Sequence, residues 1–460
     1  METIDNKDVA VLGMWISCNY GAVLTSYALY RLVEELGYNP TLIDHSGHPK
    51  MPLRFKDKST CFRKFIADRQ LQTTEPITTR EQYEALNNRF GTFVVGSDQV
   101  WRYEYNRHMG LFYYLDFVAP QNKKIAFGSS FGIERSDAPL EFMQDASMLL
   151  KCFSALSSRE KSGVDILADQ YGADAKFVLD PVFLCNKESW KECIDASTRN
   201  TPSNKYVLSY VLDPSPQKRW TIQHVATREN LALLNMVDAQ TNFAAKKAKL
   251  GLDNVIAGLT VEDWIFYIYH CEHLVTDSFH GVCFAIIFNK PFTCIVNESR
   301  GSARFTSLLG TFGLESRMMT EKEKPVVADA MPDIDWEQVN NVWLKLKDES
   351  SQFLKDALDT PKTPSQISQE EIVYRWSNLR HQFSWVQGVT QRLYAAQERH
   401  EQTIRNLNFV LSYKKNKREY RRLKFLSWIT FGKKRRKYKQ KLKEARKLYH
   451  LSKNAKKTYL

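Results

Sequence analysis

The feature that most constrains the fold of this 460-residue chain is a regular alternation of short apolar strands with amphipathic helices. It begins with an expected strand at 9–14, a helix at 21–36 and a second strand at 38–44. Because parallel strands need a crossover connection, this βαβ opening predicts a doubly wound α/β sheet.

The alternation restarts after a polar stretch at 196–205, with a new strand at 206–212. We therefore expect two Rossmann-like halves that face each other across a cleft, where the loops at several strand ends converge. The predicted domains are two Rossmann-like halves, a helical extension and a basic aromatic tail, at 1–195, 196–320, 321–412 and 413–460.

Charge is distributed unevenly along the chain. Residues 361–460 contain 26 Lys and Arg against 6 Asp and Glu, a net charge of +20, which leaves −7 for the first 360 residues. The net positive charge of the chain therefore comes from residues 361–460.

The eight cysteines form no CxxC pair and lie mostly in apolar segments, so we expect reduced thiols of a cytoplasmic protein. The acidic start argues against a signal peptide, and no apolar run has the length of about 18 residues that spans a membrane. Without a visible metal-ligand cluster, we also expect metal independence.

One strand–turn–helix unit of the second half carries an imidazole where its helix begins, in Thr276-Asp277-Ser278-Phe279-His280-Gly281. Ligands of open α/β sheets bind at strand carboxyl ends, and a helix start offers N–H groups and a positive dipole end to an anion. The dipole disfavours an imidazolium in an empty site, whereas a bound anion favours protonation of His280. This predicts an acid/base role for His280, although a lone His after a strand is more often structural.

Further motifs occur in a characteristic order. They are Asn19-Tyr20-Gly21-Ala22, Gly96-Ser97-Asp98-Gln99-Val100-Trp101, Ser157-Ser158-Arg159-Glu160, Leu179-Asp180-Pro181-Val182, the His280 segment, Asn289-Lys290-Pro291-Phe292, and Arg304 in a helix ending near Gly313-Leu314. Over residues 8–317 this ordered set resembles the polysaccharide pyruvyl transferase family. The resemblance implies a GT-B-like fold, phosphoenolpyruvate as donor substrate without a separate cofactor, and a glycan or lipid-linked oligosaccharide as acceptor. The product would be a pyruvate ketal on a bacterial surface polysaccharide.

Phosphoenolpyruvate carries a phosphate and a carboxylate, for which guanidinium groups are the best bidentate partners. We therefore expect Arg159 and Arg304 to bind the donor. Arg159 could instead only pair with Glu160, and Arg304 could be a surface residue of an amphipathic helix.

Ketal formation needs an acid for the enol carbon and a base for the hydroxyl groups. The expected catalytic residues are His280 and Asp98. Both Asp98 and Asp277 have a competing interpretation as helix caps.

The expected substrate-binding residues also include Asn19, Tyr20 and Gly21, at the first helix start, and Ser278. Many family members have an Arg two residues before the His, where this chain has Ser278. The missing charge would have to come from Arg304, Arg300 or Lys290.

The tail has two features of its own. Apolar residues recur at alternating spacings of four and three from Ile372 to Leu411, which predicts a long helix that forms a coiled coil, and hence a homo-oligomer, or packs along the body. The aromatic segment at 425–431 lies between basic runs. This arrangement favours an anionic membrane surface over nucleic acid or a plain solvated tail, and predicts association with the inner face of the cell membrane.

Three functions remain open because fold alone does not decide among them. They are a phosphoenolpyruvate-dependent pyruvyl transferase, a nucleotide-sugar-dependent GT-B glycosyltransferase and a non-catalytic membrane-associated scaffold.

Overall fold

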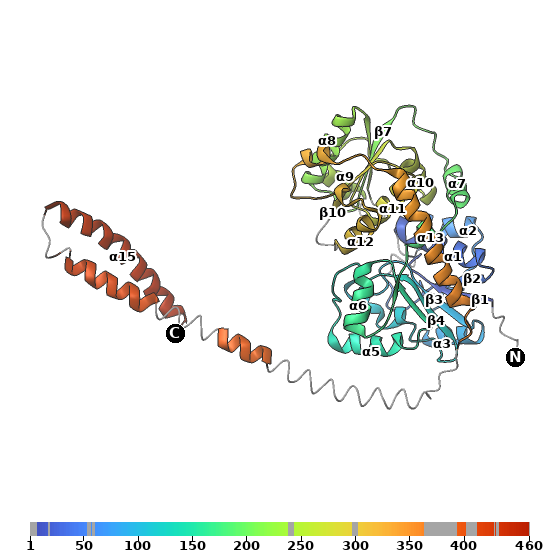
Figure 1. Cartoon of the computed structure of the whole chain (residues 1–460), viewed down its shortest axis with the longest axis horizontal. Coiled ribbons are helices and arrows are strands. Elements are labelled where there is room, and N and C mark those ends of the chain that lie inside the picture. The colour runs from blue at the N-terminus through green and yellow to red at the C-terminus, as the bar shows by residue number, and fades with distance from the viewer. Residues whose placement is uncertain are drawn as a thin grey trace. The chain divides into compact units, whose positions relative to one another are not determined.

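The computed structural model describes residues 7–16, 19–52, 57, 60–237, 243–296, 302–362, 393–401, 412–426, 428 and 432–459. The chain divides into two compact units, Met1–Ile367 and Ser368–Leu460 (Figure 1). The first unit contains two parallel sheets flanked by helices, so the predicted α/β fold with two Rossmann-like halves and a helical C-terminal extension is confirmed.

The N-terminal half is a six-stranded parallel sheet in the order β2-β1-β3-β4-β5-β6. Its strands are β1 (Asp8–Leu12), β2 (Asn39–Leu42), β3 (Thr92–Val95), β4 (Lys123–Ser129), β5 (Ala155–Ser158) and β6 (Lys176–Phe177). The chain reverses its direction across the sheet between β1 and β3. At such a switch point the connecting loops separate and leave room for ligands, and here those loops carry Asn19 and Asp98.

The C-terminal half is a five-stranded parallel sheet in the order β11-β10-β9-β7-β8. Its strands are β7 (Tyr206–Val211), β8 (Ala232–Val237), β9 (His273–Thr276), β10 (Phe292–Val296) and β11 (Met318–Thr320). The strand–turn–helix unit predicted around His280 is confirmed as β9 followed by α11 (Phe279–Ile287).

The helices that connect and cover the sheets of the first unit are α1 (Tyr20–Glu35), α2 (Cys61–Asp68), α3 (Arg80–Ala85), α4 (Tyr103–Asn106), α5 (Leu140–Leu150), α6 (Lys161–Tyr171), α7 (Lys187–Asp195), α8 (Pro216–Glu229), α9 (Phe243–Leu250), α10 (Val261–His270), α11, α12 (Ala303–Phe312) and α13 (Trp336–Asp359).

A continuous hydrophobic core joins the two halves. The ring of Tyr20 from α1 stacks on Trp264 of α10, with centroids 5.7 Å apart, and Trp190 of α7 contacts Phe284 of α11 edge to face. Buried aromatic contacts of this kind define one relative position of the halves, and hence of the loops between them.

Helix α13 lies within the predicted helical extension and packs on the N-terminal half. The indole of Trp343 donates a hydrogen bond to the carbonyl of Phe183 at 2.8 Å, and Lys123 donates to the carbonyl of Leu358 at 2.6 Å. The last helix of this unit is therefore anchored on the N-terminal half, although the strands that directly precede it in sequence belong to the sheet of the C-terminal half.

The second unit contains helical residues at 393–401 and 412–426, and α15 (Gly432–Tyr459). Most of the predicted 372–411 coiled coil lies outside the described residues. No helix in the described ranges is long and apolar enough to cross a membrane.

Candidate functional site

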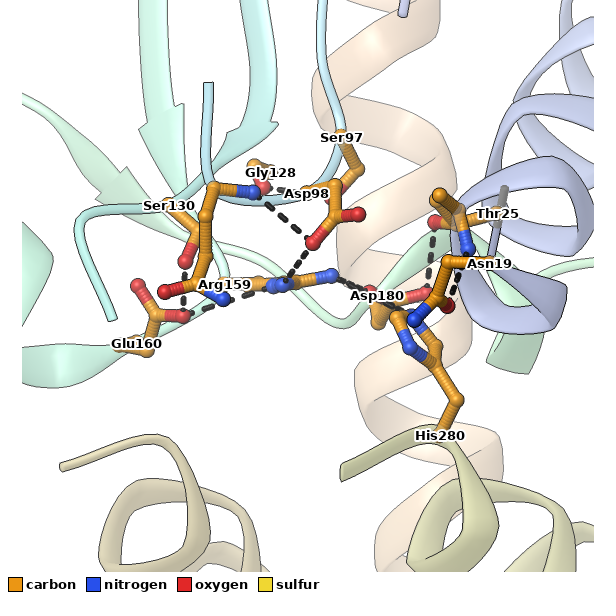
Figure 2. A network of polar contacts seen from close by, with 12 residues as sticks. Asn19, Thr25, Ser97, Asp98, Gly128, Ser130, Arg159, Glu160, Asp180 and His280 are labelled. Carbon is orange, nitrogen blue, oxygen red and sulfur yellow. Dashed lines mark hydrogen bonds and ion pairs between the residues drawn. The ribbon is translucent and has the colours of Figure 1, made fainter. Parts of the chain in front are cut away.

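Three loops bring the predicted site residues together where the two halves meet (Figure 2). Asp98 follows β3, Arg159 follows β5 directly, and His280 is the second residue of α11. Because the strands are parallel, their carboxyl ends lie at one edge of the sheet, and the start of α11 approaches that edge from the other half.

Arg159 is the centre of this arrangement. Its Nη2 donates to Asp98 Oδ1 at 2.9 Å, its Nη1 to Asp180 Oδ2 at 2.5 Å and its Nε to Glu160 Oε1 at 3.4 Å. Its side chain is 0% exposed, and the three carboxylates outweigh burial and raise its pKa. We call these four residues and His280 the Arg159 cluster.

Two carboxylates of the cluster are held in the ionised form. Burial by itself would raise the pKa of Asp180 and of Asp98, but the charge of Arg159 outweighs it and the pKa of each carboxyl group is lowered. Asp180 Oδ1 also accepts hydrogen bonds from the hydroxyl of Thr25 at 2.9 Å and the amide of Val182 at 3.0 Å. The cluster therefore keeps fixed negative charges next to its cation.

Asp98 does not cap a helix, so that alternative is wrong. Its φ is +78°, whereas an N-cap residue has an extended conformation, and the next helix, α4, begins only at Tyr103. Its Oδ1 accepts from the amide of Gln99 and from Arg159. With 14% of its side chain exposed, Asp98 is the member of the cluster that solvent reaches most easily.

His280 points its Nε2 into the cluster. This atom lies 3.4 Å from Arg159 Nη1 and 3.6 Å from Asp180 Oδ2. On the other side of the ring, a Cβ atom at Gly21 would lie 2.0 Å from Nδ1, so only glycine allows α1 to approach the imidazole this closely. Gly21 therefore contributes by leaving space for His280.

Arg304, the second residue of α12, is buried near the cluster. With 8% of its surface exposed, it is not the surface residue that the alternative assumed. Its guanidinium lies 5.6 Å from the centre of the Phe279 ring, and that of Arg159 lies 4.7 Å from the same ring. Burial, followed by the charge of Arg159, lowers its pKa, and among the described residues its Nε has no hydrogen-bond partner.

The structure gives local roles to the remaining predicted residues of the two helix starts. Asn19 caps α1 by accepting from the amide of Ala22, and Ser278 caps α11 by accepting from the amide of Gly281. Tyr20 is fully buried, and its hydroxyl donates to the carbonyl of Leu259 at 3.1 Å. Contact between Tyr20 and a substrate would therefore require this core contact to open.

Asp277 is not a helix cap, because Ser278 has that position. Its carboxylate accepts from Lys218 Nζ at 2.7 Å and from the amides of Leu212 and Asp213. It ties the loop after β7 to the loop after β9, next to the start of α11.

Of the two other cations considered as replacements for the family Arg, Lys290 lies at the wrong end of α11. Its Nζ lies 5.7 Å from the centre of the Tyr269 ring, and it follows the C-terminal end of α11, which a helical rise of about 1.5 Å per residue places roughly 10 Å from His280. Arg300 lies outside the described residues. Arg304 is therefore the candidate near His280.

Sequence reasoning named Glu160 only as a pairing partner of Arg159, and it assigned no role to Asp180, Thr25, Ser130 or Phe279. Ser130 donates to Glu160 Oε1 at 2.5 Å, which completes the polar contacts of that buried carboxylate. A usable signal was present in Asp180 and Glu160, because a carboxylate placed at a strand end inside an apolar sheet needs a buried partner. Within the ranges that the structure describes, no group of three or more His, Cys, Asp or Glu side chains is placed to hold a metal ion.

Solved structures show only a distant likeness. A glycosyltransferase from Rickettsia africae has 9% sequence identity and a TM-score of 0.42, with 83% of this chain and 98% of that chain covered. MnaA from S. aureus, solved with UDP, has 13% identity and a TM-score of 0.47, with 78% of this chain and 99% of that chain covered. These values carry no argument about function.

No curated protein is significantly similar in sequence. The model of one protein family, described as polysaccharide pyruvyl transferase, matches residues 19–299. This match covers more than half of the chain and includes the Arg159 cluster. The chain therefore belongs to the polysaccharide pyruvyl transferase family.

Proposed function

We propose that this protein transfers a pyruvyl group from phosphoenolpyruvate to two hydroxyl groups of one sugar, in a bacterial surface polysaccharide or its lipid-linked precursor. The observation that carries the proposal is the buried guanidinium of Arg304 near the His280 site, whose Nε has no hydrogen-bond partner among the described residues. A buried N–H group of a cation without an acceptor is costly, and a bound anion removes that cost.

Arg304, and not Arg159, is the proposed anion ligand. Three carboxylates already surround Arg159, so a substrate anion could bind it only by displacing one of them. Ser302 makes no side-chain capping bond at the start of α12, so the first amides of this helix add donors near Arg304. Arg304 thereby supplies the charge that Ser278 does not.

His280 is the proposed proton donor to C3 of phosphoenolpyruvate. Protonation turns the CH₂ group into a methyl group while the first sugar hydroxyl adds to C2. The C2–O bond to phosphate then breaks, phosphate leaves, and the second hydroxyl adds to C2 to close the ketal. Of the two hydroxyl protons, one balances the proton added to C3 and the other leaves with phosphate.

Asp98 is proposed to orient the acceptor hydroxyls. Its lowered pKa makes it a weak base, but an ionised carboxylate with one oxygen engaged by Arg159 can still accept a hydrogen bond on the other. Its partial exposure suits contact with a large glycan.

The charges around His280 suit a proton donor. Arg159 and Arg304 face three carboxylates, so these five side chains carry a net charge of −1. An imidazolium at His280 would balance that charge and supply the proton that the reaction consumes.

The proposed reaction takes place in the cytoplasm. The seven described cysteines are free thiols, as suits a reducing compartment.

The test begins with ligand-dependent thermal stability of the full chain, because a ligand that binds only the folded state raises the melting temperature. We expect shifts with phosphoenolpyruvate and with 2-phospholactate, which has the same anionic groups without the double bond. Only phosphoenolpyruvate should then release phosphate when an acceptor glycan is added.

Two other outcomes would replace the proposal. A shift with nucleotide sugars alone would indicate a glycosyltransferase. A cellular glycan unchanged by His280→Gln, but altered by removal of residues 412–460, would indicate a non-catalytic scaffold.

A further inference from the structure

The second unit contains a pair of helices that pack on each other, residues 412–426 and α15, which we call the tail hairpin (Figure 1). The rings of Tyr420 and Tyr449 stack with centroids 5.3 Å apart, and Tyr413 stacks on the same Tyr449 at 5.8 Å. Leu423 and Ala445 are buried between the helices. The chain therefore reverses direction between the two helices, near residue 428.

The outer surface of the tail hairpin is strongly basic. Its inward positions recur every three or four residues, which leaves the other positions of each helix facing solvent. Thirteen exposed Lys and Arg side chains stand against two exposed acidic side chains, Glu419 and Glu444, among the described residues of the hairpin. The surface is thus complementary to a strongly anionic partner.

The end of the hairpin is aromatic. Phe425 is 60% exposed and Trp428 is 75% exposed, and both lie where the chain reverses. Two large apolar rings in water, next to many cations, match the boundary between anionic headgroups and acyl chains. There the rings leave water, and each nearby cation is attracted to the anionic headgroups.

We propose that the tail hairpin docks on an anionic lipid membrane with Phe425 and Trp428 inserted at the headgroup level. Nucleic acid is the less suitable partner, because a basic stripe alone binds its phosphates and gives no reason for an exposed ring pair at the reversal. Docking goes beyond the proposed reaction, since it would hold the enzyme at the surface where lipid-linked acceptors lie.

The test is co-sedimentation of the full-length protein with phosphatidylcholine vesicles, with and without phosphatidylglycerol. We expect binding only with phosphatidylglycerol, and a loss on the order of tenfold or more in the double variant Phe425→Ser/Trp428→Ser. The matched control is Leu448→Ser, which removes another exposed apolar side chain (56% exposed) about 24 Å along α15 from its start. The control should bind vesicles like the unaltered protein.

Circular dichroism shows whether each variant keeps its helices. Equal binding by the double variant and the unaltered protein, or equal binding to both vesicle types, would overturn the proposal. Tight binding of a duplex oligonucleotide that the double variant retains, without vesicle binding, would assign the surface to nucleic acid. Phosphate release with a soluble acceptor is measured separately, so failure here leaves the transferase proposal intact.

Discussion

Arg159 and Arg304 are both buried, and both lie against the ring of Phe279, but their surroundings differ. Around Arg159, at the strand edge of the N-terminal half, each guanidinium nitrogen donates to a carboxylate on the protein. At the start of α12 in the C-terminal half, Arg304 keeps an Nε without a partner among the described residues. A buried guanidinium whose donors are all paired on the protein holds the surrounding side chains in place. A buried guanidinium with an unpaired donor can instead bind the anion of a substrate.

His280 gives the largest expected effect, because it contacts the paired cation and is the proposed proton donor. We expect His280→Gln to lower the rate of phosphate release by about 10²–10⁴-fold. Phosphoenolpyruvate should still raise the melting temperature of this variant, because Arg304 remains. A variant that releases phosphate at the normal rate would remove His280 from the chemistry.

Arg159→Met tests the arginine that is already paired with carboxylates on the protein. It leaves three carboxylates without their cation, so we expect the free energy of unfolding to fall by about 3–5 kcal/mol. Urea denaturation measures this change. An unchanged midpoint would mean that the Arg159 cluster does not hold the strand ends together.

Arg304→Met tests the arginine whose Nε has no hydrogen-bond partner among the described residues. The free energy of unfolding should stay the same or rise, because the buried Nε of Arg304 has no hydrogen-bond partner to lose among the described residues. The affinity for phosphoenolpyruvate should fall by roughly 10–100-fold, as for the loss of a hydrogen bond to a charged group. Isothermal titration compares it with Lys290→Met, a cation of the same half that lies away from His280 and should leave affinity unchanged. Equal losses in both variants would contradict a specific role for Arg304.

Acid unfolding gives a smaller effect. The pKa values of Asp98 and Asp180 are lowered in the folded protein, so their stabilisation is fully present above the ordinary carboxyl pKa of about 4. It is lost as the pH falls through the lowered values. Melting temperatures measured from neutral pH to about 3 should therefore drop less steeply in Arg159→Met than in the unaltered protein. Parallel curves would mean that Arg159 does not lower these pKa values.

The local pattern of apolar and turn residues was enough to predict the strands and helices that position the site residues. The helix predicted at 21–36 is present as Tyr20–Glu35, the strand predicted at 206–212 as Tyr206–Val211, and the turn before His280 is also where the sequence predicts it. Apolar periodicity and turn residues reflect interactions between neighbours in the chain, so they can be recognised without knowledge of the tertiary structure. The interpretation of Asp98 and Asp277 as helix caps was wrong. The positive φ of Asp98 does not fit an N-cap, and the carboxylate of Asp277 pairs with Lys218, which is distant in sequence.

The sequence by itself determined the two-half α/β architecture, the family and the position of His280 at a helix start. Only the tertiary structure decided which charges meet. Arg159 pairs with Asp180, 21 residues later, and Arg304 lies beside Phe279 without a carboxylate partner in the described chain. Pairing of buried charges depends on distances across the fold, because Coulomb energy and desolvation both change steeply over a few ångströms. Sequence spacing does not contain those distances.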